Sequence, residues 1–229
     1  MAKKFDIVAL GEILIDFTES GISENGMKLF EQNPGGAPAN LLVTASHMGC
    51  KTAIIGKTGK DLHGVFLKKT LEAENICTDY IVEDNTVFTT LAFVALDENG
   101  ERQFSFARKP GADTCLQIQE LNKEALKECK IFHFGSLSLT DEPAKSATIE
   151  AVKTAKEAGA VISFDPNYRE LLWNSEKDAA ETINKAIQYA DMVKVSDEES
   201  IMLSGENNYK KAALKLLQKG PRIIAVTLG

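Results

Sequence analysis

The sequence has no excess of positive charge and no long apolar run. Its 33 acidic side chains outnumber the 26 basic ones, giving a formal net charge of -7. Nucleic-acid binding requires a basic face to meet the phosphates, so this balance argues against a nucleic-acid partner. No apolar stretch approaches the ~20 residues of a membrane span. Because a charge also interrupts the first apolar stretch, at Asp6, we expect no signal peptide, no membrane partner and a cytoplasmic location.

Cysteine and histidine are scarce and widely spaced. The four cysteines show no Cys-x-x-Cys spacing and lie at Cys50, Cys77, Cys115 and Cys129. We interpret them as reduced structural residues of a cytosolic protein. The three histidines, His47, His63 and His133, make no zinc pattern.

Several nucleotide and catalytic motifs are also absent. No Gly-x-Gly-x-x-Gly follows a predicted strand, which argues against a hydride-transfer dinucleotide fold. Gly56-Lys57-Thr58 suggests a Walker A motif, but the earlier glycine that this motif requires would fall at Lys51. No Gly-x-Ser-x-Gly elbow is present.

Strands and helices alternate along most of the 229 residues. Short apolar runs predict strands at 8–10, 13–17, 52–55, 131–134, 161–164, 192–195 and 223–227. Helical periodicity predicts helices at 41–48, 61–73, 144–158, 177–190 and 209–217. This alternation indicates an α/β fold with a mostly parallel sheet covered by helices. No linker is evident, so we expect one domain over 1–229.

Two segments do not fit the alternation. Strands at 89–96 and 102–107 flank Asn99-Gly100, a strong hairpin signal. The polar stretch 19–33 contains only a short extended patch at Lys28-Leu29-Phe30. We expect both segments to form a small β-layer that projects from the edge of the sheet.

The segment Asn33-Pro34-Gly35-Gly36-Ala37-Pro38-Ala39-Asn40 is typical of a glycine-rich loop that opens a helix. Adjacent glycines let the backbone approach a ligand, and Pro38 suits the first helical turn. An ordinary strand-to-helix turn is the alternative. Polar residues also follow five predicted strands, where open α/β sheets bind ligands, although each one alone is typical of a cap or turn: Asp16, Ser136, Asp165, Ser196 and Thr227.

Five segments of the chain carry a resemblance to a known family: residues 11–16, 34–40, 56–64, 165–173 and 194–199. They resemble the signatures of the PfkB (ribokinase-like) carbohydrate kinases, and residues 33–40 are close to the fructokinase version. Ser196 stands where many relatives have Asn. The resemblance implies a Rossmann-like αβα sandwich with a β-sheet lid, formed by about 12–33 and 86–110, and ATP-dependent phosphorylation of a sugar hydroxyl. D-fructose is the favoured substrate. A 2-keto-3-deoxygluconate kinase, a ribokinase, a nucleoside kinase and a non-catalytic sugar-binding fragment stay open.

The resemblance also assigns residues to a sugar site and a nucleotide site. The sugar-site residues are Asp16, Gly35, Gly36, Asn40, Phe106, Arg108, Ser136 and Arg169. The ATP-site residues are Asn167, Lys194, Ser196, Glu199, Thr227 and Gly229, with Glu199 also ordering the water shell of Mg²⁺. Three of these have alternatives: Arg108 as a solvated lid charge, Phe106 with Phe104 as packing under the lid, and Glu199 as a first-turn glutamate favoured by the helix dipole.

Residues 1–229 contain no match to the family's Gly-Ala-Gly-Asp element, whose aspartate is the general base. We therefore expect the base beyond Gly229 and an inactive or nearly inactive polypeptide. The resemblance leaves a monovalent cation open as a further cofactor and a homodimer through the lid open as an assembly.

Overall fold

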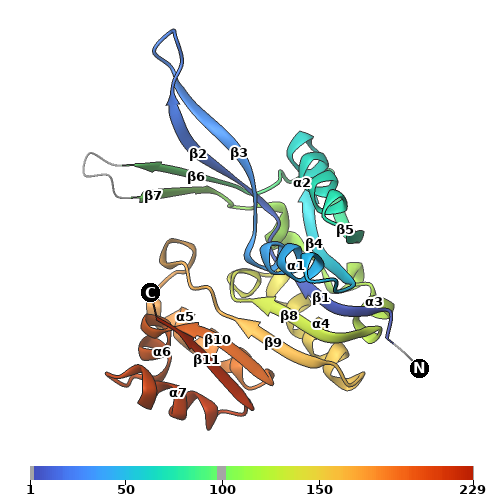
Figure 1. The fold of residues 1–229 in the computed structure, drawn as a ribbon, viewed down its shortest axis with the longest axis vertical. Helices are drawn as coiled ribbons and strands as arrows, with labels where there is room; N and C mark the ends of the chain where they lie inside the picture. The colour runs from blue at the N-terminus through green and yellow to red at the C-terminus, as the bar shows by residue number, and fades with distance from the viewer. Residues whose placement is uncertain (1–2, 97–101, 229) are drawn as a thin grey trace.

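A computed structural model describes residues 3–96 and 102–228, and its largest element is a parallel sheet of seven strands (Figure 1). The strand order is β11-β10-β9-β8-β1-β4-β5. All paired neighbours run parallel. The strands are β1 (Phe5–Leu10), β4 (Thr52–Gly59), β5 (Ile76–Asp84), β8 (Cys129–Gly135), β9 (Val161–Asp165), β10 (Met192–Ser196) and β11 (Ile223–Thr227). The predicted α/β class is confirmed.

Helices cover both faces of this sheet. They are α1 (Ala37–His47), α2 (Leu62–Ala73), α3 (Lys123–Lys127), α4 (Ala144–Glu157), α5 (Glu176–Ile187), α6 (Asp197–Ser204) and α7 (Tyr209–Leu217). Four short 3₁₀ helices complete the described ranges: η1 (Ala112–Cys115), η2 (Ile118–Glu120), η3 (Leu137–Leu139) and η4 (Glu170–Leu172). None of the helices in these ranges combines the length and the apolar character that a bilayer crossing requires.

The core has two parts because side chains of a strand alternate between its faces. On β1, Val8 and Leu10 belong to a core with the buried faces of α4 and α5, whereas Ala9 packs on the other side with α1 and α2. The alanine stripe predicted for 144–158 is the buried face of α4. At the start of α2, the predicted cap Asp61 accepts hydrogen bonds from the backbone N–H groups of His63 and Gly64.

A second sheet of four strands projects from the main body, as Figure 1 shows. Its order is β3-β2-β6-β7, formed by β2 (Leu14–Ile22), β3 (Lys28–Gly35), β6 (Leu91–Leu96) and β7 (Arg102–Ala107). Strand β2 pairs antiparallel with β3 and parallel with β6, and β6 pairs antiparallel with β7. The predicted turn at Asn99-Gly100 lies outside the described residues.

The small β-layer predicted from residues 19–33 and the hairpin is confirmed, and its strands are longer than the short extended patch predicted at Lys28-Leu29-Phe30. Strand β2 continues to Ile22, and β3 runs from Lys28 to Gly35. Much of this hairpin is exposed, so its strands carry no apolar alternation, and the backbone pairing between them stabilises the extended conformation.

Candidate active site

A cavity of about 760 Å³ lies between the second sheet and the carboxyl-terminal end of the main sheet. The second sheet contributes Leu14, Asp16, Thr18, Glu19, Asn33, Val94, Phe104 and Phe106 to its lining. The main body contributes Glu12, Gly36, Ala37, Asn40, Leu137, Asn167 and Arg169. The structure thus brings together five of the residues predicted for the sugar site: Asp16, Gly36, Asn40, Phe106 and Arg169.

Asp16 presents a half-buried carboxylate to this cavity from β2. Burial raises its pKa, and the nearby Arg169 lowers it. Gly35, although it does not line the cavity, makes room for Asp16, since a Cβ at position 35 would lie 2.2 Å from Asp16 Oδ2. Within the described residues the Asp16 side chain has no hydrogen-bond partner, so its oxygens are available to a ligand.

The glycine-rich segment is shorter as a loop than we expected. Asn33 to Gly35 belong to β3, and Asn40 already lies in the first turn of α1. Only Gly36 separates the two elements, with a φ of 114°, and a Cβ there would lie 2.3 Å from the backbone oxygen of Glu12. The prediction of a loop over 33–40 is therefore wrong in extent, because pairing with β2 extends β3 up to the helix.

Glu12 was missed by sequence reasoning. Its side chain is buried, with 2% of the residue exposed. Oε1 accepts a hydrogen bond of 2.9 Å from the Ala37 N–H, and Oε2 has no partner. Burial raises its pKa to about 7, against the opposing effect of the hydrogen bond from the Ala37 N–H; Asp113 also raises the pKa and Arg108 lowers it. The available signal was a lone charge between the apolar residues of β1 and β2.

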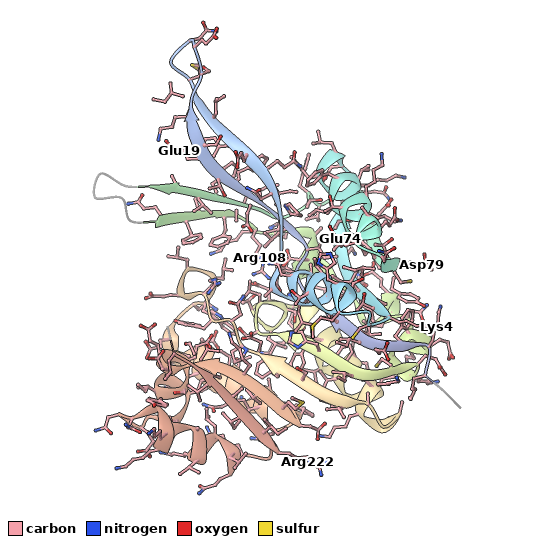
Figure 2. The ribbon with its side chains drawn as sticks, in the orientation of Figure 1. Lys4, Glu19, Glu74, Asp79, Arg108 and Arg222 are labelled. Atoms are coloured by element: carbon pink, nitrogen blue, oxygen red, sulfur yellow. The ribbon has the colours of Figure 1, made fainter. Side chains whose placement is uncertain are left out.

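Arg108 lies where the second sheet joins the main body (Figure 2). It is 5% exposed, so its interpretation as a solvated lid charge is wrong. Nη2 lies 2.7 Å from Asp113 Oδ2 and donates to the Leu137 carbonyl at 2.8 Å, while Nη1 donates to Thr140 Oγ1 at 3.0 Å. Arg108 does not line the cavity, and its donors face protein groups. Its predicted contact with sugar or phosphate stays untested.

Ser136 is also placed behind the cavity wall. It is fully buried, its N–H donates to the Pro166 carbonyl at 3.1 Å, and its Oγ has no partner. Its neighbour Leu137 lines the cavity instead. The predicted sugar contact of Ser136 stays a prediction.

A second cavity of about 430 Å³ adjoins the first. It is lined by Asn167, Tyr168, Arg169, Glu176, Lys194, Ser196, Glu198, Glu199 and Met202. Four of the residues predicted for the ATP site are in this set. Thr227 is not, although it ends β11 next to Ser196 of β10, and Gly229 lies outside the described residues. Asn167 and Arg169 line both cavities.

Glu199 has the geometry of a helix cap. Its Oε1 accepts from the Tyr168 N–H and its Oε2 from the Ser196 N–H, both at 2.7 Å, while Ser196 Oγ accepts from the Glu199 N–H at 3.1 Å. This is a capping box at the start of α6. The alternative interpretation of Glu199, as a glutamate in the first turn of a helix, therefore agrees with its contacts. Each of its carboxylate oxygens already accepts one hydrogen bond.

Lys194 pairs with Asp165 across neighbouring strands. Lys194 Nζ lies 3.2 Å from Asp165 Oδ2, and Asp165 Oδ1 accepts from the Asn167 N–H at 3.1 Å. Burial raises the pKa of Asp165, and Lys194 lowers it. In residues 3–96 and 102–228, no three Asp, Glu, His or Cys side chains gather to hold a metal ion. The residues present therefore fit a cation bound through phosphates and water rather than one enclosed by protein ligands.

A parallel αβα core with two adjoining cavities at its strand ends, one of them bounded by a small second sheet, defines a ribokinase-like kinase. The model of the pfkB family carbohydrate kinases matches residues 4–229. The chain belongs to this family, as its sequence predicted.

Individual relatives agree with this assignment. "Probable fructokinase-2" from Arabidopsis thaliana is 42% identical over 226 residues, which span 97% of this chain and 69% of the relative. The crystal structure of fructokinase with bound ATP from Xylella fastidiosa aligns with a TM-score of 0.88 and 35% identity, over 97% of this chain and 68% of that one. Fructokinase from Vibrio cholerae O395 in its fructose, ADP and calcium ion bound form aligns with a TM-score of 0.87 and 31% identity, over 98% and 71%.

Proposed function

We propose that this chain forms the sugar site and part of the nucleotide site of an ATP-dependent fructokinase. Membership of the carbohydrate kinase family and the similarity to fructokinases support this activity. The observation that carries the site assignment is the pair of adjoining cavities. One contains an unpartnered carboxylate and an amide, and the other contains a lysine and a helix N-terminus.

The larger cavity suits a polyol. Asp16 can accept hydrogen bonds from sugar hydroxyls, and the Asn40 amide can both donate and accept. Phe104 and Phe106 stack with ring centroids 6.4 Å apart and give the cavity an apolar wall. We assign Arg169, which lines both cavities, to a contact with the sugar or the transferred phosphate.

The smaller cavity suits the phosphates of ATP. Lys194 supplies positive charge, and the N-terminus of α6 at Ser196 favours an anion. ATP-bound and ADP-bound relatives support nucleotide use, and one of them contains calcium. We propose Mg²⁺ as the ion in this chain, held by phosphates and by water that contacts Glu199. When bound, it would neutralise phosphate charge. A monovalent cation is a further proposal that rests on the resemblance.

Calorimetric titration with fructose tests the sugar site. Asp16→Asn should weaken fructose binding by about 10- to 150-fold, because a hydrogen bond to a charged group contributes about 1.5–3 kcal/mol. Asp178→Asn, at a partly exposed position on α5, is the matched control. Ribose, 2-keto-3-deoxygluconate and nucleosides complete the ligand panel. Failure of the wild-type chain to bind fructose would contradict the proposed substrate.

A coupled ADP-release assay tests catalysis by the 229-residue polypeptide. Among the described residues we assign no general base, since Asp165 is paired with Lys194 and Asp16 is assigned to binding hydroxyls. We therefore propose that the described residues bind fructose, and the non-catalytic sugar-binding fragment is the alternative to the kinase. Turnover at ordinary kinase rates, ~1–100 s⁻¹, would exclude that alternative.

We also propose that the second sheet acts as a lid and supports a homodimer. Its exposed apolar side chains include Leu29, Phe30 and Phe93, and such a patch favours a protein contact. Light scattering of the wild type and of Phe30→Ser would test the dimer. A cytoplasmic location is proposed from the four free thiols.

A further inference from the structure

Glu12 joins two segments of the sugar site that are 25 residues apart in the sequence, the turn after β1 and the start of α1. Glu12 follows β1, and its Oε1 accepts a hydrogen bond from the Ala37 N–H, the first of α1. Its backbone oxygen lies so close to Gly36 that a Cβ at that position would clash with it. Helix α1 has no cap from its own N-cap residue, because Gly36 has no side chain. Glu12 therefore supplies from a distance the acceptor that a serine or aspartate ordinarily provides.

The same carboxyl group is incompletely satisfied. Oε2 is sealed from solvent and has no hydrogen-bond partner among the described residues. The charged groups that act on Glu12 are Asp113 of η1, which raises its pKa, and Arg108 after β7, which lowers it. Because Arg108 and Asp113 pair with each other, they offset much of each other's effect, and burial dominates.

We propose that Glu12 is a positioning residue that fixes the Gly36–Ala37 turn against the sugar cavity and makes sugar affinity depend on pH. An ionised carboxylate that is buried without a second partner is costly. At high pH the chain therefore favours arrangements in which Glu12 reaches water, and these release the Ala37 N–H. Since Gly36, Ala37 and Asn40 all line the sugar cavity, such a release changes the shape of the site.

A bound sugar would strengthen this dependence. It occupies the cavity through which an ionised Glu12 would reach water, so ionising Glu12 becomes harder, and binding is then linked to proton uptake. This inference rests on the proposed sugar site. We expect the wild-type chain to bind fructose about 3- to 10-fold more weakly at pH 8 than at pH 6.

Three variants separate positioning from simple structural support. Glu12→Gln keeps an acceptor for the Ala37 N–H and cannot ionise, so its fructose affinity should match the wild type at pH 6 and change less than about 2-fold up to pH 8. Glu12→Ala should bind weakly at both pH values. Glu157→Gln, an exposed substitution on α4, should keep the pH dependence of the wild type.

The closing experiment pairs calorimetric titration of fructose with amide hydrogen exchange of residues 36–40 in the sugar-free chain. Protection of these amides, corrected for intrinsic exchange, should fall from pH 6 to pH 8 in the wild type and stay level in Glu12→Gln. If that difference appears without any fructose binding, positioning stands and the proposed function fails. If the wild type and Glu12→Gln show the same pH dependence in exchange, or in fructose affinity where fructose binds, positioning by Glu12 is overturned.

Discussion

We expect His133 to make the folded chain less stable as the pH falls from neutral to mildly acidic. Its side chain lies inside the main sheet on β8, 3% exposed, and its Nδ1 is 3.0 Å from the Oγ of Ser163 on β9. Burial lowers its pKa to about 4, from 6.5. The folded chain therefore keeps His133 neutral over a range in which the unfolded chain takes up a proton.

The sign and size of the effect follow from this difference. As pH falls below 6.5 the unfolded state binds a proton that the folded state refuses, so stability is lost until the pH reaches about 4. A full shift of that size corresponds to about 3 kcal/mol at 1.36 kcal/mol per pKa unit. About 2 kcal/mol of it should be lost between pH 8 and pH 5.

Urea unfolding followed by circular dichroism at pH 5, 6, 7 and 8 measures this loss. His133→Asn retains a polar partner for Ser163 and does not titrate, so its curve should lack the contribution of His133. The difference between the two curves of unfolding free energy against pH isolates the contribution of His133 from that of Glu12. The raised pKa of Glu12 changes stability in the opposite direction, because it lowers stability as the pH rises. Parallel pH curves for wild type and variant would refute the argument.

Three further outcomes are expected. Gly36→Ala should lower the Tm and weaken fructose binding, since its Cβ would lie 2.3 Å from a backbone oxygen. Gly49→Ala, which also has positive φ but meets nothing within 4 Å, is its control, and equal effects on both readouts would contradict a role for the close contact. Arg108→Met should cost about 3–5 kcal/mol in urea unfolding, because it leaves Asp113 buried without its partner, and a loss below about 1 kcal/mol would contradict this. Asp61→Ala should cost at least about 1 kcal/mol in the same assay, because it removes the cap of α2 and two bonds to Thr89; an unchanged midpoint would refute it.

Sequence patterns predicted much of the parallel core because most of its strands are short apolar runs that alternate with helical periodicity. Strands β9, β10 and β11 were located to within a residue or two, since each is a short β-branched run between helices. Strand β5 was missed. It runs from Ile76 to Asp84 at the edge of the sheet and mixes polar with apolar residues, so its pairing with β4 determines its structure.

The candidate site could be predicted only where a local motif carries it. Asp16 and Asn40 were found through the family signature, and the structure places both on one cavity. The roles of Glu12 and Arg108 depend on partners at Ala37 and Asp113, and tertiary contacts of this kind leave no local pattern. Arg108 looked like a lid charge because it follows the predicted hairpin and precedes Lys109, whereas its surroundings in space are buried.

The segment Asn167 to Arg169 forms part of both cavities, and the Tyr168 N–H ties it to Glu199 of α6. A ligand that shifts this segment on one side alters the walls that the other ligand meets. The two affinities are then coupled, and thermodynamic linkage requires the coupling to be reciprocal: the factor by which nucleotide changes the affinity for sugar equals the factor by which sugar changes the affinity for nucleotide.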